Sequence, residues 1–224
     1  MNITQVLIFD TETTGITDPV LIEAAGIYIE GSPLDKQENS FIQRYNPGKP
    51  ISFGAMAIHN ILEDDLINCP LSSEFKLDDR VKYLVGHNID FDWSVIGKPN
   101  VKRIDTLVMA REVFPKLDSH SLPALSYALC EPDRRKKLRE TLKNTHNALV
   151  DVNLCLDILR KILTIKNELH SWNAIWTFSE EARIPKTMSF GKYKGTLIKD
   201  IPDDYRDWLK KQPDIDEYLL KALN

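Results

Sequence analysis

An apolar run that ends in two carboxylates is the sequence feature that most constrains the fold of this chain. Residues 6–9 read Val-Leu-Ile-Phe, and Asp10-Thr-Glu12 follows at once. Such a run is typical of a buried strand, and residues two apart on a strand point to the same face. Asp10 and Glu12 then hold two like charges side by side, which is costly without a cation between them. The pattern predicts a site for a hard divalent ion such as Mg²⁺, and the apolar run disfavours a solvated edge strand.

The order of strand-like and helix-like segments predicts an α/β fold with a mixed sheet flanked by helices. Three strand-like segments with short connections, at residues 6–9, 20–30 and 40–45, indicate an antiparallel meander. Further strands and helices then alternate along the chain. We expect strands at 83–87 and 101–104, and helices at 54–61, 72–77, 91–96, 107–113, 122–129 and 148–169.

The regular pattern breaks near residues 178–186, and this break divides the chain. We expect a main domain at 1–170, a linker at 171–186 and a small C-terminal module of unknown role at 187–224. The module has a strand-like start, a Gly-Lys-Tyr-Lys-Gly turn and two short helical stretches. Large apolar side chains give it the means to form a small core of its own: Tyr205, Trp208, Tyr218 and Leu219.

Composition disfavours several classes of protein. The 224 residues are 42% hydrophobic and 28% charged, which is ordinary for a globular protein, and no apolar run is long enough to span a bilayer. The N-terminus lacks the features of a signal peptide. Three cysteines without a Cys-x-x-Cys pair disfavour a disulfide framework and a zinc site. We therefore expect no membrane partner and a reducing, cytoplasmic environment for Cys69, Cys130 and Cys155.

Two further motifs carry acidic residues. In His87-Asn-Ile-Asp90-Phe-Asp92, Asp90 is expected to cap the next helix and Asp92 is the better metal ligand, although spacing alone leaves both open. In His146-Asn-Ala-Leu-Val-Asp151, the acid falls in the first turns of the long helix and the histidine in the loop before it. His-x-x-x-x-Asp is a weak pattern by itself, because a histidine in a loop is usually solvated.

Basic side chains gather in two places, although the net charge of −4 is not that of a general nucleic-acid coat. Residues 134–143 contain six basic side chains against one acidic residue. Such a run is usually a solvated helix face, and its position just before His146 also favours contact with phosphates. Lys192-Tyr193-Lys194 joins an aromatic ring to basic charge, which suits base stacking, with an ordinary hairpin as the slightly favoured interpretation.

Taken together, these motifs resemble those of the DEDDh 3′→5′ exonucleases of the DnaQ-like superfamily. Five residues match the three exonuclease motifs of that family in order: Asp10 with Glu12, Asp92, and His146 with Asp151. Residues 55–61 and 105–111 also resemble the segments on either side of the second motif. The tail that begins Phe-Gly-Lys-Tyr at residue 190 resembles that of bacterial exonuclease X, so the resemblance covers nearly the whole chain.

The resemblance implies a ribonuclease H-like fold and release of nucleoside 5′-monophosphates from a 3′ end. It also implies two Mg²⁺ ions, roughly 3.5–4 Å apart, with Mn²⁺ fitting the same oxygen ligands. Asp10 would bridge both ions. Glu12 and Asp151 would complete one ion site, and Asp92 would serve the other. His146 would take the proton from the attacking water, which suits a histidine pKa of about 6.5.

The resemblance also places five residues at the substrate: Thr13, Gly15, Ile16, His59 and Asn88. Gly15 permits a tight turn after the first strand. Ile16 is a candidate wedge against the terminal base, with an ordinary loop residue as an equal alternative. His59 resembles a contact to the terminal nucleotide, although a buried helix histidine fits as well.

Trimming of DNA, as single strands or duplex 3′ ends, in repair is the leading hypothesis. A ribonuclease acting on RNA would use the same site residues, because the 2′-hydroxyl is recognised by local contacts that the sequence does not locate. The alternative from another class is a proofreading-type subunit whose C-terminal module docks on a DNA polymerase. The folded character of residues 187–224 disfavours a flexible docking peptide.

Overall fold

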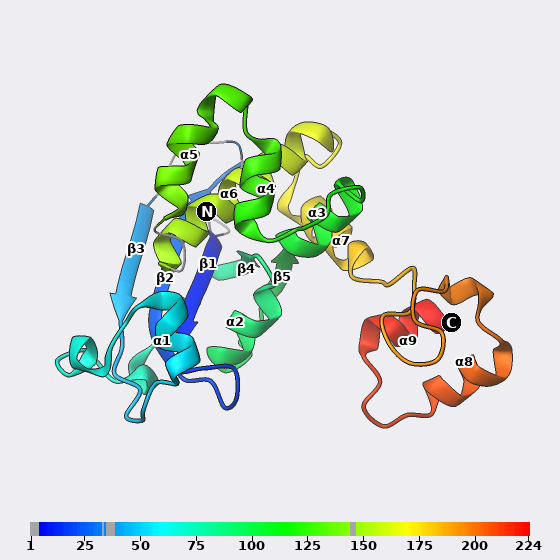
Figure 1. Ribbon diagram of the computed structural model, residues 1–224, viewed down its shortest axis with the longest axis horizontal. Helices are drawn as coiled ribbons and strands as arrows, with labels where there is room; N and C mark the ends of the chain where they lie inside the picture. The colour runs from blue at the N-terminus through cyan, green and yellow to red at the C-terminus, as the bar shows by residue number, and fades with distance from the viewer. Residues whose placement is uncertain (1–4, 33, 35–38, 144–146) are drawn as a thin grey trace.

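A five-stranded mixed sheet forms the centre of the protein. The computed structural model describes residues 5–32, 34, 39–143 and 147–224. The strands lie in the order β3-β2-β1-β4-β5 (Figure 1). The pairs β1–β2 and β2–β3 are antiparallel, and the pairs β1–β4 and β4–β5 are parallel. The predicted meander and mixed sheet are confirmed, with strands at Gln5–Thr13 (β1), Leu21–Glu30 (β2), Asn39–Arg44 (β3), Val81–Gly86 (β4) and Lys102–Asp105 (β5).

Helices cover both faces of this sheet. The alternation of side chains along β1 divides the core, because Val6 and Ile8 pack with α3, α4, α6 and α7 while Leu7 and Phe9 pack with α2. The helices are Phe53–His59 (α1), Ile89–Val95 (α2), Thr106–Val113 (α3), Leu122–Leu129 (α4), Arg135–Leu142 (α5), Ala148–Ile165 (α6), Trp172–Ala182 (α7), Asp203–Lys210 (α8) and Glu217–Leu223 (α9).

Helix α6 is the longest helix and lies across the sheet centre, in contact with β1 and β2. Its apolar face is almost completely buried along its whole length, as the helical spacing in the sequence predicts. The side chain of Asn147 caps its start by accepting hydrogen bonds from the amides of Leu149 and Val150. The position of the first turn of α6 is thus fixed both by packing and by capping.

Several local predictions were wrong. Strand β1 does not stop before Asp10 but continues to Thr13. The helix expected at 72–77 is only a short 3₁₀ turn at Ser72–Glu74. Asp90 does not cap α2, because Asn88 holds that position in a left-handed conformation with φ of 70°. Local pattern reading failed here because each outcome depends on contacts with distant parts of the chain.

The segment 171–186, expected as a linker, contains helix α7. Ile175 and Ser179 of this helix are fully buried against the main core, and α7 contacts both α3 and β5. Its aromatic residues pack at the edge of that core rather than marking a break in it. Any irregular connection to the C-terminal module is therefore limited to about 183–186.

The C-terminal module has a small hydrophobic core of its own. Its strand-like start is reduced to one isolated bridge between Thr187 and Leu197, and α8 and α9 follow. In Figure 1 this module lies at the end of the molecule away from β3. Within the described ranges, no helix is long and apolar enough to cross a membrane. The module core consists of Met188, Ile198, Ile201, Leu209, Leu219 and Leu223.

We expect Leu159→Ala to lower the free energy of unfolding by about 2–5 kcal/mol, because this fully buried side chain of α6 would leave a cavity. Ile165→Ala is the matched control on the same helix. That side chain is 55% exposed, and its truncation should cost at most about 0.5 kcal/mol. Urea unfolding followed by circular dichroism measures both values. Equal losses in the two variants would contradict the packing of α6.

Candidate active site

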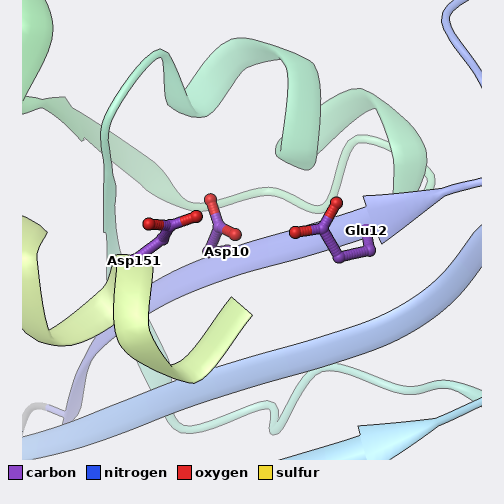
Figure 2. Close-up of side chains that lie close together, drawn as sticks. All are labelled: Asp10, Glu12 and Asp151. Atoms are coloured by element: carbon purple, nitrogen blue, oxygen red, sulfur yellow. The ribbon is translucent and has the colours of Figure 1, made fainter. Parts of the chain in front are cut away.

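Three carboxylates meet where the start of α6 crosses β1. One carboxylate oxygen from each of Asp10, Glu12 and Asp151 lies within 4.8 Å of the other two. Figure 2 shows Asp10 and Glu12 on one side of β1 and Asp151 reaching toward them from the first turns of α6. Carboxylate oxygens at this spacing match the ligand preference of hard divalent cations such as Mg²⁺. The three side chains therefore form a candidate cation site.

Asp92 lies on α2 and is buried, with 5% of the residue exposed. Its Oδ1 accepts hydrogen bonds from the amide of Thr11 at 2.9 Å and from the hydroxyl of Thr11 at 2.6 Å. Thr11 stands between the two acids of β1, so this contact fixes α2 beside them. Among the described residues, Asp92 borders the three-carboxylate cluster without being part of it. A role for Asp92 at a second ion stays a prediction.

Burial and mutual repulsion dominate the electrostatics of these acids. Burial, followed by the charges of Asp92 and Asp151, raises the pKa of Asp10 well above its ordinary value. Burial and Asp151 raise the pKa of Glu12 to about 8. Burial raises the pKa of Asp92 to about 7, although the hydrogen bonds from Thr11 oppose the shift. A divalent cation bound among these carboxylates would offset their repulsion and displace their protons, so the electrostatics fit a metal site.

Glu23 is a fifth acidic residue at this place, and the sequence analysis missed it. It is 1% exposed on β2, directly opposite Glu12, and its charge contributes to the raised pKa of Glu12. One oxygen pairs with Arg44 at 2.9 Å, and the other accepts the amide of Ala148 at 3.4 Å. The contact ties β2 to the start of α6. A charged residue inside the apolar run of 21–29 was the signal that could have revealed it.

An open groove of about 480 Å³ begins at Glu12 and runs between the loop after β1 and helix α1. Four of the predicted substrate residues line it: Thr13, Gly15, Ile16 and His59. The structure places Ile16 at 87% exposure, whereas His59 is buried and its Nδ1 accepts the amide of Ile61. A Cβ at Gly15 would lie 2.9 Å from Oγ of Ser52, so only glycine permits this close approach of loop and helix.

Asn88 and His146 differ from the other predicted site residues. Asn88 is the N-cap of α2, and its amide donates to Oδ1 of Asp105 at 3.0 Å, so the structure shows it holding the helix that carries Asp92. His146 lies outside the described residues, and its role as general base stays a prediction. The described chain resumes at Asn147, the cap of α6.

The two basic segments have ordinary structural settings. Residues 135–142 form the exposed helix α5. Glu140 of this helix pairs with Arg139 and with Lys143, the C-cap residue. In the C-terminal module, Tyr193 is half-buried and packs edge-on against Tyr205, with ring centroids 4.8 Å apart. The neighbouring Lys192 and Lys194 are exposed. The first segment is thus an exposed helix and the second a turn with exposed lysines. Contact of either segment with nucleic acid stays a prediction.

Comparison with known proteins places this arrangement in a family. Residues 7–159 match the model of the RNase_T family, described as exonuclease. The chain belongs to this exonuclease family. Residues 181–214 match a second family, described as a putative quorum-sensing-regulated virulence factor. The family match confirms the predicted resemblance and the predicted enzyme class, an exonuclease.

Individual relatives extend this comparison. The chain is 26% identical over 217 residues to exodeoxyribonuclease 10 of Escherichia coli K12, covering 90% of this chain and 89% of that protein. It is 30% identical over 174 residues to the PolC-type DNA polymerase III of Bacillus cereus, covering 70% of this chain but only 11% of that much longer protein. The structure of exonuclease X in complex with 5′ overhanging duplex DNA aligns with a TM-score of 0.60 at 23% identity, covering 78% of this chain and 99% of that one. This likeness confirms the predicted ribonuclease H-like fold.

Without a cation, the protein should lose stability as the pH rises from about 4.5 to about 8. The pKa of Glu12 is about 8 in the folded state against an ordinary 4.5, so the folded state holds more protons in this window. The free energy of unfolding therefore falls with increasing pH. We expect Glu12→Gln to stabilise the metal-free protein at pH 8 by on the order of 1 kcal/mol or more.

Thermal unfolding in EDTA at pH 5 and pH 8 measures this effect, with Glu30→Gln at the exposed end of β2 as the control. Added Mg²⁺ at pH 8 should stabilise the wild-type protein more than Glu12→Gln. A metal-free Glu12→Gln variant that is less stable than wild type at pH 8 would contradict the electrostatics described here.

Proposed function

We propose that this chain is a metal-dependent 3′→5′ exodeoxyribonuclease that releases nucleoside 5′-monophosphates from the 3′ ends of DNA. One observation carries the proposal: in a member of the exonuclease family, Asp10, Glu12 and Asp151 converge on one point. Asp92 lies beside that point, and an open groove leads to it. This arrangement suits hydrolysis at the end of a polymer that lies along the groove.

The carboxylates would hold two Mg²⁺ ions, for which Mn²⁺ can substitute. When bound, such ions polarise the scissile phosphate, activate water and stabilise the leaving 3′ oxygen. Asp10 is central to this arrangement because the charges of the other acids all act on it. Asp92 is held by Thr11 in a fixed position next to Asp10. His146 would accept the proton of the attacking water, and the oxygen of the new phosphate bond comes from that water.

The groove would receive the terminal nucleotides. Exposed Ile16 lines it from the loop after β1, where an apolar side chain can pack against the face of the last base. Thr13 lies next to the carboxylate cluster in sequence and lines the same groove. His59 closes the opposite wall from the end of α1. Contacts from both walls would position the last phosphodiester bond at Asp10 and Glu12.

DNA is the favoured substrate because one relative over most of the chain is an exodeoxyribonuclease and the aligned exonuclease X structure contains DNA. RNA is the alternative polymer, since the same acids would hydrolyse either. The likeness to a PolC-type polymerase favours, as a second candidate, an exonuclease that works with a DNA polymerase. We place the activity in DNA repair in the cytoplasm, where the three free cysteines remain reduced.

Asp10→Asn and Asp151→Asn should each lower exonuclease activity by at least about a hundredfold, because each removes a ligand charge from the cation site. Asp157→Asn is the matched control, since it makes the same change on the exposed side of α6. The test uses end-labelled single-stranded DNA, duplex DNA and RNA, with Mg²⁺ or EDTA. Stepwise shortening from the 3′ end that needs Mg²⁺ is the expected result, with His146→Ala also inactive. A folded wild-type protein that degrades none of these polymers would refute the proposal.

Ile16→Ala should raise the KM for DNA about three- to tenfold while kcat stays within about twofold, because the change removes packing against the last base and leaves the acids intact. Since Ile16 is almost fully exposed, the melting temperature should not change. Ile67→Ala, a similarly exposed isoleucine away from the groove, is the control. Unchanged KM in Ile16→Ala would remove this residue from the substrate site.

A further inference from the structure

Arg183 is a buried cation just after α7, in the segment expected as a linker. Its side chain is only 4% exposed. Its guanidinium donates to Oδ2 of Asp90 and also lies 3.4 Å from Glu180 and 3.9 Å from Asp105. A buried guanidinium is costly unless carboxylates surround it, so this group is held by its partners and holds them in turn.

Two of these partners fix the start of helix α2. Asp90 is in the first turn of α2, two residues before Asp92. Asp105 accepts the amide of Asn88 at 3.0 Å, and Asn88 is the residue at which α2 begins. Arg183 thus contacts α2 at its first turn and, through Asp105, at its cap. Thr11 holds the same turn from the opposite side through Asp92.

The arrangement around Asp90 contains a second arginine. Arg103 of β5 donates to Oδ1 of Asp90 at 2.6 Å, and its guanidinium lies 4.1 Å from the ring centre of Trp93 on α2. Asp105 receives further support, because its amide donates to Oγ of the buried Ser179 on α7 at 2.8 Å. Helix α7 and strand β5 therefore form a rigid support behind α2.

The C-terminal module contacts the same group. Tyr218 of α9 donates its hydroxyl to both carboxylate oxygens of Glu180 at 3.1 Å, and its ring lies 5.4 Å from the guanidinium of Arg183. Burial raises the pKa of Tyr218 above its ordinary value, so the hydroxyl keeps the proton that it donates. Glu217, the neighbouring residue, lies 3.8 Å from Arg103. Helix α9 therefore reaches both arginines that hold Asp90.

We propose that Arg183 is a positioning residue that fixes Asp92 at the cation site through Asp90 and Asp105, and that Tyr218 of the C-terminal module completes this support. The proposal rests on the proposed function, because it assigns Asp92 to cation binding. It gives the C-terminal module, through Tyr218, a role in a site whose acidic residues lie between positions 10 and 151. Loss of these contacts would loosen the first turn of α2 and so weaken cation binding, with little effect on the groove.

The choice of arginine follows from geometry. A planar guanidinium with several donors can contact Asp90 and lie near Asp105 at the same time, whereas the ammonium of lysine is a single point charge. Arg183→Lys is therefore expected to retain the pairing with Asp90 and lose the longer contact with Asp105. This difference makes Arg183→Lys a partial-rescue variant beside Arg183→Met.

The experiment measures Mn²⁺ affinity by isothermal titration calorimetry without DNA, and kcat and KM on DNA separately. Arg183→Met should weaken Mn²⁺ affinity by about 10–100-fold and lower kcat, with KM within about threefold of wild type. Arg183→Lys should recover part of the affinity, and Tyr218→Phe should lose a smaller part. Lys186→Met is the control, because Lys186 is in the same segment as Arg183 but its ammonium pairs with Glu112 of α3, which is not among the described partners of Arg183.

A folded Arg183→Met variant with wild-type Mn²⁺ affinity and kcat would overturn the proposal. If Arg183→Met does not fold, Asp90→Asn decides: reduced Mn²⁺ affinity supports the proposal and unchanged affinity overturns it. The two proposals fail in different ways. A wild-type protein that neither binds Mn²⁺ nor shortens DNA would refute the proposed function. If the wild-type protein is active and the Arg183→Met variant is equally active, only the role of Arg183 is refuted.

Discussion

The repulsion among carboxylates at the centre of the sheet is the constraint on which the rest of this structure depends. Asp10 and Glu12 share one side of β1, and the fold brings a carboxylate oxygen of Asp151 to within 4.8 Å of an oxygen of each. Holding three buried or half-buried acids together is unfavourable at neutral pH, and the raised pKa values of Asp10 and Glu12 express that cost. The packing of α6 against the main core provides the opposing free energy, so the protein can hold the site together before a cation binds.

Contacts at the junction of α6 with β2 hold Asp151 in place against the repulsion among the carboxylates. Asn147 caps the helix, and Glu23 reaches the amide of Ala148 while pairing with Arg44. The negative charge of Glu23 stands at the positive end of the helix dipole, which favours this contact even though the site is acidic. The first turn of α6 is consequently held by local and long-range contacts, and Asp151 belongs to that turn. A site that relies on a fixed distance between carboxylates needs this rigidity.

The second half of the chain supports the site from behind. Helix α7 buries Ser179 and Ile175, and the residue that follows it, Arg183, joins α2 to the C-terminal module. None of these contacts is local, since Arg183 and Asp90 are 93 residues apart. A local pattern could not reveal them. An aromatic-rich segment at the edge of a core resembles a break in periodicity until the surface that it covers is known. For this reason the sequence alone predicts a linker at 171–186.

The sequence by itself determined the sheet and the main acidic residues. Apolar runs mark the strands, helical spacing marks α6, and a strand period of two puts Asp10 and Glu12 on one side. These features depend only on neighbours along the chain. The tertiary structure alone decided that Glu23 joins the site, that Asn88 rather than Asp90 begins α2, and that Arg183 is buried among acids. Burial and ion pairing depend on tertiary contacts, because distant segments of the chain exclude water from a side chain and supply its charged partners.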